Sequence, residues 1–152
     1  AEANPDLPFE LVLNSTAAEI ETYFAERQLP ENLTWYPAQE DVRPFYERAR
    51  VLLNLSLPDQ WVETFGMTAL EAMSYGVPCI VPPVGGIAEL VQEGQTGYQV
   101  DSRRLPRLNE RITELFSNTL LYQQLSLNCR QFAQRFSSNR LVNDVYEVLF
   151  LI

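Results

Sequence analysis

The sequence contains no histidine and no lysine, so all eleven of its basic side chains are arginines. Without histidine, Ser-His-Asp and Cys-His catalysis are excluded, and the commonest zinc ligand is absent. Cysteine is almost as scarce: Cys79 falls in an apolar strand pattern and Cys129 in a helical one. Two unclustered cysteines indicate a reducing compartment rather than a disulfide framework, and we expect Cys79 to lie in the core.

Long apolar runs and a net positive charge are missing as well. No segment approaches the about 18 apolar residues of a membrane span, and no signal-peptide pattern is present, so we expect a cytoplasmic protein without a membrane span. The formal net charge is -9, which repels phosphate backbones and makes nucleic acid a poor partner. A small anionic ligand remains possible, because backbone N–H groups at helix starts do not enter the charge count.

The pattern of the chain is one of alternating strands and helices. Its 152 residues, 46% of them hydrophobic, suit one domain over 1–152 with a real core. The connections are too long for hairpins, which predicts an α/β fold with a Rossmann-like, doubly wound parallel sheet. We expect strands at 9–13, 33–36, 51–55, 78–81 and 97–100, and helices at 17–28, 39–49, 66–75, 86–92, 105–116, 119–136 and 138–149.

Two local patterns support these elements. Thr16 followed by Glu19 fits a capping box at the start of the first helix. The continuous apolar run at 51–55 is typical of a strand that is buried on both faces. Pro44 falls early in the helix at 39–49, so that helix is expected to begin later than its apolar periodicity indicates.

The stretch 61–86 gathers glycines and carboxylates around a helix start. Gly66 begins the helix, and a strand that leads through a loop into such a start can seat a phosphate on unpaired N–H groups. In an open α/β sheet this loop lies at the carboxyl ends of the strands, where ligands bind. Glycine placement alone leaves the alternative that Gly66 only makes a turn.

Two glutamates flank this helix start, with seven residues between them. Glu71 sits at the edge of the apolar arc that Met67, Leu70 and Met73 are expected to form on the helix. It is either a solvated border residue or an acceptor for ligand hydroxyls, as acidic residues are for ribose in nucleotide-binding folds. Glu63 precedes the helix; a loop glutamate is usually solvated, but its spacing from Glu71 favours a paired role.

The string E-T-F-G-M-T-A-L-E-A-M-S-Y-G-V-P, followed by V-P-P-V-G-G-I-A-E-L-V and G-Q-T-G-Y, resembles the signature of retaining glycosyltransferases of family 4. The resemblance covers 33–100 well and the terminal helices more loosely. It implies the C-terminal, donor-binding half of a GT-B enzyme, with extra C-terminal helices. The substrate of such an enzyme is a nucleoside-diphosphate sugar, and neither a cofactor nor a metal is expected.

The resemblance also assigns roles to individual residues. Glu63 matches the glutamate near the donor sugar and phosphates, which we take as the catalytic residue, and Glu71 matches the glutamate that binds ribose hydroxyls. The other donor-binding positions are Tyr36, Pro37 and Ala38 for the base, Ser56 for the wall of the cleft, Thr64, Phe65, Gly66, Met67 and Thr68 for the diphosphate, and Gly85 and Gly86 for the lining of the same cleft.

The sequence departs from the family pattern in two ways. Thr64 stands where members usually have glycine, a change that keeps both Glu63 and Gly66. The larger departure is at the start, where the first strand–helix unit of the donor domain, with its glycine, arginine and lysine, is missing. The strand it contributes normally lies between the strands at 9–13 and 51–55. We therefore expect a fragment that binds donor weakly and lacks an N-terminal acceptor domain as its partner.

The leading hypothesis is transfer of a sugar from its nucleoside diphosphate to an acceptor hydroxyl with retained configuration. A nucleotide-sugar epimerase of the same architecture is the alternative among enzymes. A non-catalytic α/β interaction module is the alternative outside them. A phosphorylated receiver needs clustered aspartates and a late lysine, whereas Asp41, Asp59 and Asp101 are scattered and lysine is absent.

Overall fold

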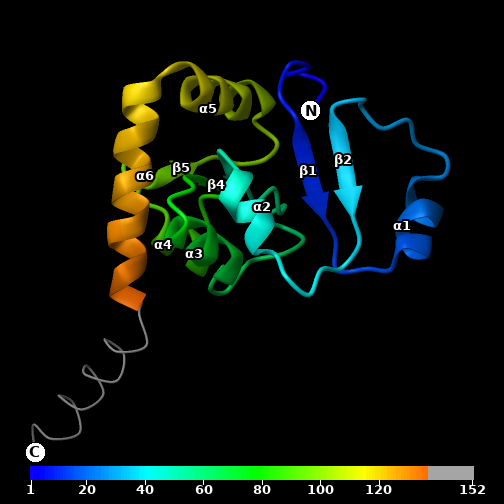
Figure 1. Ribbon diagram of the computed structural model, residues 1–152, viewed down its shortest axis with the longest axis horizontal. Coiled ribbons are helices and arrows are strands. Elements are labelled where there is room, and N and C mark those ends of the chain that lie inside the picture. Colours follow the sequence, from blue (N-terminus) through cyan, green and yellow to red (C-terminus); the bar gives the residue numbers. More distant parts are fainter. Residues whose placement is uncertain (137–152) are drawn as a thin grey trace, which may run out of the picture. The chain divides into compact units, whose positions relative to one another are not determined.

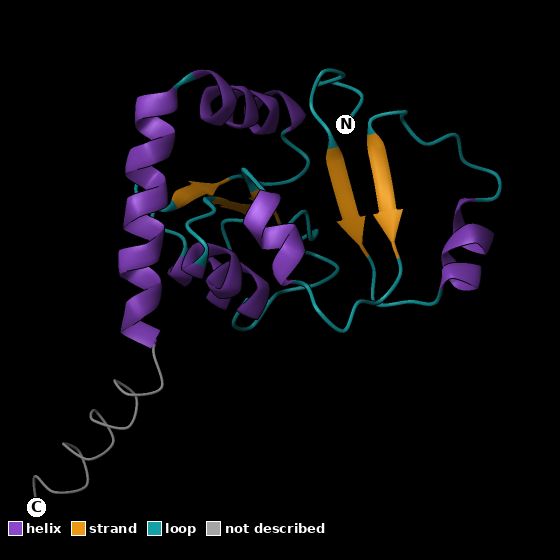
Figure 2. Cartoon of the chain, viewed as in Figure 1, coloured by secondary structure: helices purple, strands orange, loops and turns teal. Residues whose placement is uncertain are grey.

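The computed structural model describes residues 1–136, and these residues fold into an α/β structure with parallel strands (Figure 2). This confirms the predicted fold class. The chain divides into two compact units, one covering residues 1–44 and the other beginning at Phe45. The predicted helix at 138–149 lies outside the described residues. No described helix has both the length and the apolar character that crossing a membrane requires.

The first unit is built on a pair of parallel strands that run side by side in Figure 1. The capping box is confirmed: the Thr16 N–H donates to Oε2 of Glu19 at 2.8 Å, and the Glu19 N–H donates to Oγ1 of Thr16 at 3.4 Å. The helix that it starts ends four residues earlier than the predicted Gln28. The elements of this unit are β1 (Phe9–Val12), α1 (Ala17–Phe24) and β2 (Leu33–Tyr36).

The second unit contains a three-stranded parallel sheet in the order β3-β4-β5 and most of the helices. Helix α2 spans the boundary between the units and begins only at Arg43, so that Pro44 occupies its first turn, where a missing N–H costs nothing. The elements are α2 (Arg43–Arg48), β3 (Leu52–Leu53), α3 (Met67–Ser74), β4 (Cys79–Val81), α4 (Gly86–Leu90), β5 (Gly97–Gln99), α5 (Leu105–Ser117), α6 (Thr119–Ala133) and the 3₁₀ helix η1 (Gln134–Phe136).

The strands form two sheets, and the break falls between β1 and β3, where the sequence analysis expected a strand to be missing. β1 pairs with β2, whereas β3 pairs with β4. The central strand β4 is fully buried, and Cys79 within it is inaccessible, as expected. The prediction that 51–55 is buried on both faces is wrong: β3 is half-buried and Leu55 is 48% exposed. An edge strand has a neighbouring strand on one side only, which leaves more of its surface open.

Helix α3 packs against β4, α4 and α6 with its smallest side chains. Ala69, Ala72 and Met73 are inaccessible, while Met67 is 56% exposed, so the apolar arc predicted from Met67, Leu70 and Met73 is wrong in part. The buried residues keep the i, i+3, i+4 spacing of a helix face.

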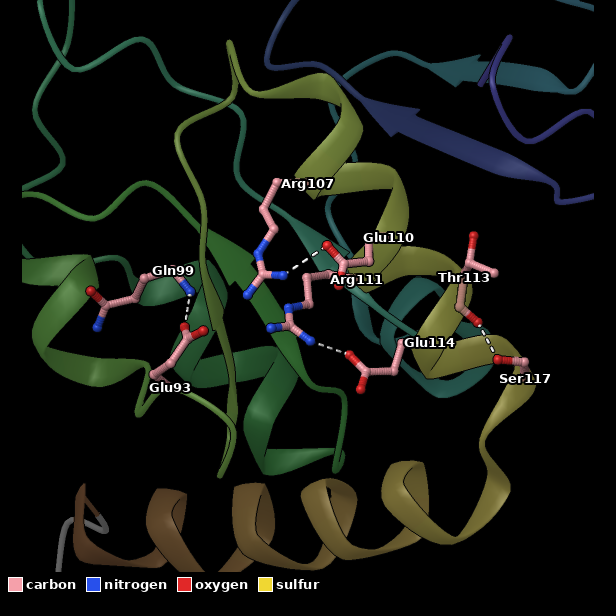
Figure 3. A network of polar contacts seen from close by, with 8 residues as sticks. All are labelled: Glu93, Gln99, Arg107, Glu110, Arg111, Thr113, Glu114 and Ser117. Atoms are coloured by element: carbon pink, nitrogen blue, oxygen red, sulfur yellow. Dashed lines mark hydrogen bonds and ion pairs between the residues drawn. The ribbon is translucent and has the colours of Figure 1, made fainter.

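Figure 3 shows the polar contacts of α5 from close by, including the pair formed by Arg111 and Glu114. The guanidinium of Arg111 lies 4.3 Å from the centroid of the Tyr98 ring and pairs with Glu114 on the next turn. Burial raises the pKa of the Tyr98 hydroxyl, and the Glu114 carboxylate raises it further. A second pair, Arg107 with Glu110, has the same spacing on the same helix but is much more exposed.

Replacing Arg111 by methionine is expected to lower the free energy of unfolding by about 1–2 kcal/mol, because it removes a cation–π contact with Tyr98 and an ion pair with the half-buried carboxylate of Glu114. Arg107→Met is the matched control, and the loss of its exposed pair is expected to cost less than about 0.5 kcal/mol. Urea denaturation of the two variants and the wild type measures both values. Equal losses would show that the contact with Tyr98 contributes nothing.

Candidate functional site

The loops that follow β3, β4 and β5 lie at one edge of the second sheet, because the three strands are parallel. Two of the loops are joined by a hydrogen bond, in which the Ser102 hydroxyl donates to the carbonyl oxygen of Ser56 at 3.5 Å. The Ser56 N–H donates to Oδ1 of Asn54 at 3.0 Å, which turns the chain at the end of β3. Ser56 is thus placed at the carboxyl edge, as predicted.

Gly66 caps the start of α3 in the left-handed conformation, with φ 81° and ψ 52°. A Cβ atom on this residue would lie 2.5 Å from Cγ1 of Ile87, the second residue of α4. Glycine is therefore required here for the turn and for the contact with α4. The first N–H groups of a helix have no carbonyl one turn back, so Met67 and Thr68 present theirs at this edge of the sheet.

The loop before α3 is held by the glycine pair that follows β4. The Gly86 N–H donates to the carbonyl oxygen of Glu63 at 2.9 Å. A Cβ atom at Gly86 would lie 1.7 Å from the carbonyl oxygen of Thr64, and one at Gly85 would lie 2.5 Å from that of Glu63. The structure therefore brings Glu63, Thr64, Gly85 and Gly86 together through their backbones.

Glu71 extends from α3 one turn after its start and meets Tyr46 of α2, which also belongs to the second unit. The Tyr46 hydroxyl donates to Oε2 of Glu71 at 2.9 Å. Burial raises the pKa of Tyr46 well above its usual value, and the Glu71 carboxylate adds to that rise because it favours the protonated hydroxyl. One oxygen of the predicted ribose-binding carboxylate is therefore fixed by the protein itself.

Several apolar side chains around the helix start are exposed. Trp61 is 66% exposed and Phe65 43%, and the Phe65 ring meets that of Phe136 edge to face at a centroid distance of 6.3 Å. The side chain of Phe65 thus turns toward η1, so any contribution to binding a diphosphate would come from its backbone. Thr68 is exposed at the first turn of α3.

The three residues predicted to hold the base belong to the first unit, whereas the other predicted site residues belong to the second. Tyr36 ends β2, and its hydroxyl donates to Oε1 of Glu10 at 3.0 Å. Pro37 follows, and the Ala38 N–H donates to the carbonyl oxygen of Ser15 at 3.0 Å. They occupy the carboxyl end of a parallel strand, which is where the sequence placed them.

The charged groups near the carboxyl edge are few. Arg103, just after β5, pairs with Asp59 of the loop before α3, and both side chains are exposed. Within residues 1–136, no group of three or more potential metal-ligating side chains comes together.

The sequence analysis did not predict the contact between Tyr46 and Glu71. A signal was present, because a tyrosine that is buried on a helix needs a partner for its hydroxyl. Tyr46 is only 9% exposed, which makes such a partner necessary.

The fold agrees with comparisons to known proteins. The profile of the family described as "Glycosyl transferases group 1" matches residues 13–134, and the chain belongs to this family. N-acetyl-alpha-D-glucosaminyl L-malate synthase of Bacillus anthracis is 34% identical over 89 residues, which are 58% of this chain and 23% of that protein.

Two solved structures resemble the fold over nearly the whole chain. A glycosyltransferase from Rickettsia africae superimposes with a TM-score of 0.79 at 19% identity, covering 97% of this chain and 41% of the other. Anabaena HepE in complex with UDP gives a TM-score of 0.76 at 20% identity, covering 99% of this chain and 44% of the other. The chain thus spans less than half the length of each protein it resembles.

Proposed function

We propose that the chain is the nucleotide-sugar-binding part of a retaining glycosyltransferase. In the proposed reaction the bond between the anomeric carbon of the sugar and the diphosphate breaks, and a bond to an acceptor oxygen forms. The acceptor hydroxyl loses its proton, and the nucleoside diphosphate leaves. Family membership supports the class of reaction, and the similarity to a protein solved with UDP supports the class of donor.

The observation that carries this proposal is the paired arrangement of Glu63 and Glu71 around the start of α3. Gly86 fixes the backbone of the first glutamate, and Tyr46 fixes the carboxylate of the second. Between them, the N–H groups of Met67 and Thr68 and the positive end of the helix dipole favour a diphosphate. The same groups stabilise the negative charge that develops on the leaving diphosphate.

Each glutamate then has a separate task. Glu71 accepts hydrogen bonds from ribose hydroxyls, which are common to the free nucleotide and the nucleotide sugar. Glu63 lies nearer the sugar and acts at the reacting centre. Tyr36, Pro37 and Ala38 receive the base, while Ser56, Gly85 and Gly86 line the site. We propose no metal and no cofactor for this arrangement, in which the N–H groups at the start of α3 meet the charge of the diphosphate.

We also propose a second, acceptor-binding domain as the partner of this chain and the cytoplasm as its compartment. The lengths of the related proteins support the first proposal, since this chain covers 23% of the B. anthracis enzyme. Two buried free cysteines, Cys79 and Cys129, support the second, because such thiols persist in a reducing compartment.

Substitution of the two glutamates is expected to separate their roles. In calorimetric or NMR titrations of the chain with UDP, GDP and ADP and their glucose conjugates, Glu71→Ala weakens nucleotide and nucleotide sugar alike by about 10- to 100-fold, as loss of a charged hydrogen bond does. Glu63→Ala weakens the nucleotide sugar more than the nucleotide. The control Glu21→Ala, on the exposed face of α1, changes neither.

Unchanged affinities in both glutamate variants would contradict the site, and absence of binding to every ligand in the panel would contradict the function. Incubation with the nucleotide sugar alone tests the epimerase alternative. Appearance of an epimerised donor in the absence of any acceptor would favour the epimerase over transfer.

A further inference from the structure

The hydroxyl of Tyr46 contacts Glu71, one of the two glutamates of the candidate site. It donates to Oε2 of Glu71 at 2.9 Å, and the ring is held by burial and by the neighbouring Tyr75 ring at a centroid distance of 5.7 Å. A buried ring with one hydroxyl partner has little freedom, so the direction of this hydrogen bond is fixed by the fold.

The remainder of Glu71 is open to a ligand. Its other oxygen, Oε1, accepts no hydrogen bond from any residue in the described part of the chain, and its side chain is exposed. The backbone of this turn is held as well, since the Ser74 hydroxyl donates to the Glu71 carbonyl oxygen at 2.6 Å. One carboxylate oxygen is thus anchored while the other faces outward, an arrangement that a freely rotating glutamate does not have.

We propose that Tyr46 is a positioning residue, which holds Oε2 of Glu71 so that Oε1 is presented to the ribose hydroxyls of the bound nucleotide. The proposal rests on the proposed function, because it assigns the ligand of Glu71. Tyr46 does not touch the ligand. It acts by removing the rotational freedom that the Glu71 side chain would otherwise lose on binding, a cost that weakens an interaction with a flexible side chain.

A contact between α3 and α6 holds the Tyr75 ring beside Tyr46. At the end of this helix, Nη2 of Arg130 donates to the carbonyl oxygen of Tyr75 at 2.9 Å, so that α6 fixes the turn that carries the neighbouring ring. Tyr75 is also the matched control. Among the described residues no hydrogen bond involves its hydroxyl, so Tyr75→Phe removes an adjacent tyrosine hydroxyl without releasing Glu71.

The test compares a nucleotide with its analogue that lacks both ribose hydroxyls. The wild-type chain is titrated with UDP, GDP and ADP, and the tightest of these and its 2′,3′-dideoxy counterpart are then titrated into Tyr46→Phe and Tyr75→Phe. Tyr46→Phe is expected to weaken the ribonucleotide about five-fold, because the released Glu71 side chain then loses its rotational freedom on binding, and to leave the dideoxynucleotide unchanged. Tyr75→Phe changes neither affinity.

A double variant completes the test. In a Glu71→Ala background, Tyr46→Phe is expected to have no further effect on ribonucleotide affinity, because the two residues act through one contact. An equal loss for ribo- and dideoxynucleotide in Tyr46→Phe would show a merely structural role, and an unchanged ribonucleotide affinity would show no role; either result overturns the proposal. If the wild type binds none of the three nucleotides, the proposed function itself fails, and this inference fails with it.

Discussion

Gly86→Ala is expected to lower the free energy of unfolding by about 3 kcal/mol and to abolish nucleotide binding. The added Cβ would lie 1.7 Å from the carbonyl oxygen of Thr64 and 3.3 Å from Cα of Phe65. Two backbone segments meet there, so no side chain can rotate away to relieve the clash. The loop must move, which breaks the hydrogen bond from the Gly86 N–H to Glu63 and displaces the start of α3.

The control for this substitution is Gly94→Ala. Gly94 has φ 70°, but a Cβ atom there would meet nothing within 4 Å. Its replacement should cost about 1 kcal/mol for the left-handed backbone alone, and nucleotide affinity should stay at the wild-type value. Thermal and urea denaturation give the stabilities, and titration gives the affinities. A Gly86→Ala chain that binds as tightly as the Gly94→Ala chain would show that the loop is not part of the site.

Gly97→Ala is expected to destabilise the whole second unit by about 3 kcal/mol or more, a large share of the 5–15 kcal/mol that stabilises a typical domain. Gly97 pairs with Cys79 in the parallel register of β4 and β5. A Cβ atom there would lie 1.9 Å from the Cys79 carbonyl oxygen and 2.8 Å from its nitrogen. β4 is the buried central strand, so separating the two strands opens the core.

Hydrogen exchange distinguishes Gly97→Ala from Gly86→Ala, because the two substitutions disturb different parts of the second unit. Gly97→Ala should lower protection of the amides of Cys79, Ile80 and Val81 from hydrogen exchange, because these strand positions lose their neighbour. Gly86→Ala should leave that protection largely in place and expose the loop instead. Wild-type exchange rates in β4 of the Gly97→Ala chain would contradict the close approach of the two strands.

The features that were predicted correctly from the sequence depend on short-range interactions. The capping box at Thr16 and Glu19, the strand at 33–36 and the start of α4 at Gly86 follow from short-range rules, and each lies where it was expected. The helix start at Gly66 was also predicted within one residue. Such signals need only the residues that form the element, so they can be read without knowledge of the tertiary contacts.

Tertiary contacts explain what the sequence did not predict. The buried face of α3 carries Ala69 and Ala72 and leaves Met67 exposed, and it packs against α6, α4 and β4, which are distant in sequence or not evident from local patterns. The sequence analysis expected a strand to be missing between β1 and β3, but it did not predict that the remaining strands would form two separate sheets. The glycine pair was predicted to line a cleft, whereas its most evident partner in the structure is the backbone of Glu63 and Thr64.

The candidate site was predicted from the resemblance more than from patterns in the residues alone. Glu63 and Glu71 stood out by their spacing, yet their separate roles came from the family signature. The contact between Tyr46 and Glu71 joins positions 25 residues apart in sequence and was not predicted at all. A hydroxyl and a carboxylate at that separation show no periodicity, so only the structure brings them together.

The most direct test of the account is the change in amide chemical shifts when a nucleoside diphosphate is added to the isotope-labelled chain. The account predicts that UDP, or GDP or ADP if one of these binds more tightly, shifts the amides of Phe65, Gly66, Met67 and Thr68 most strongly. The corresponding nucleoside, which lacks the diphosphate, should shift them little. Equal shifts with nucleoside and nucleotide, or shifts confined to residues away from the start of α3, would contradict the proposal that this helix start holds the diphosphate.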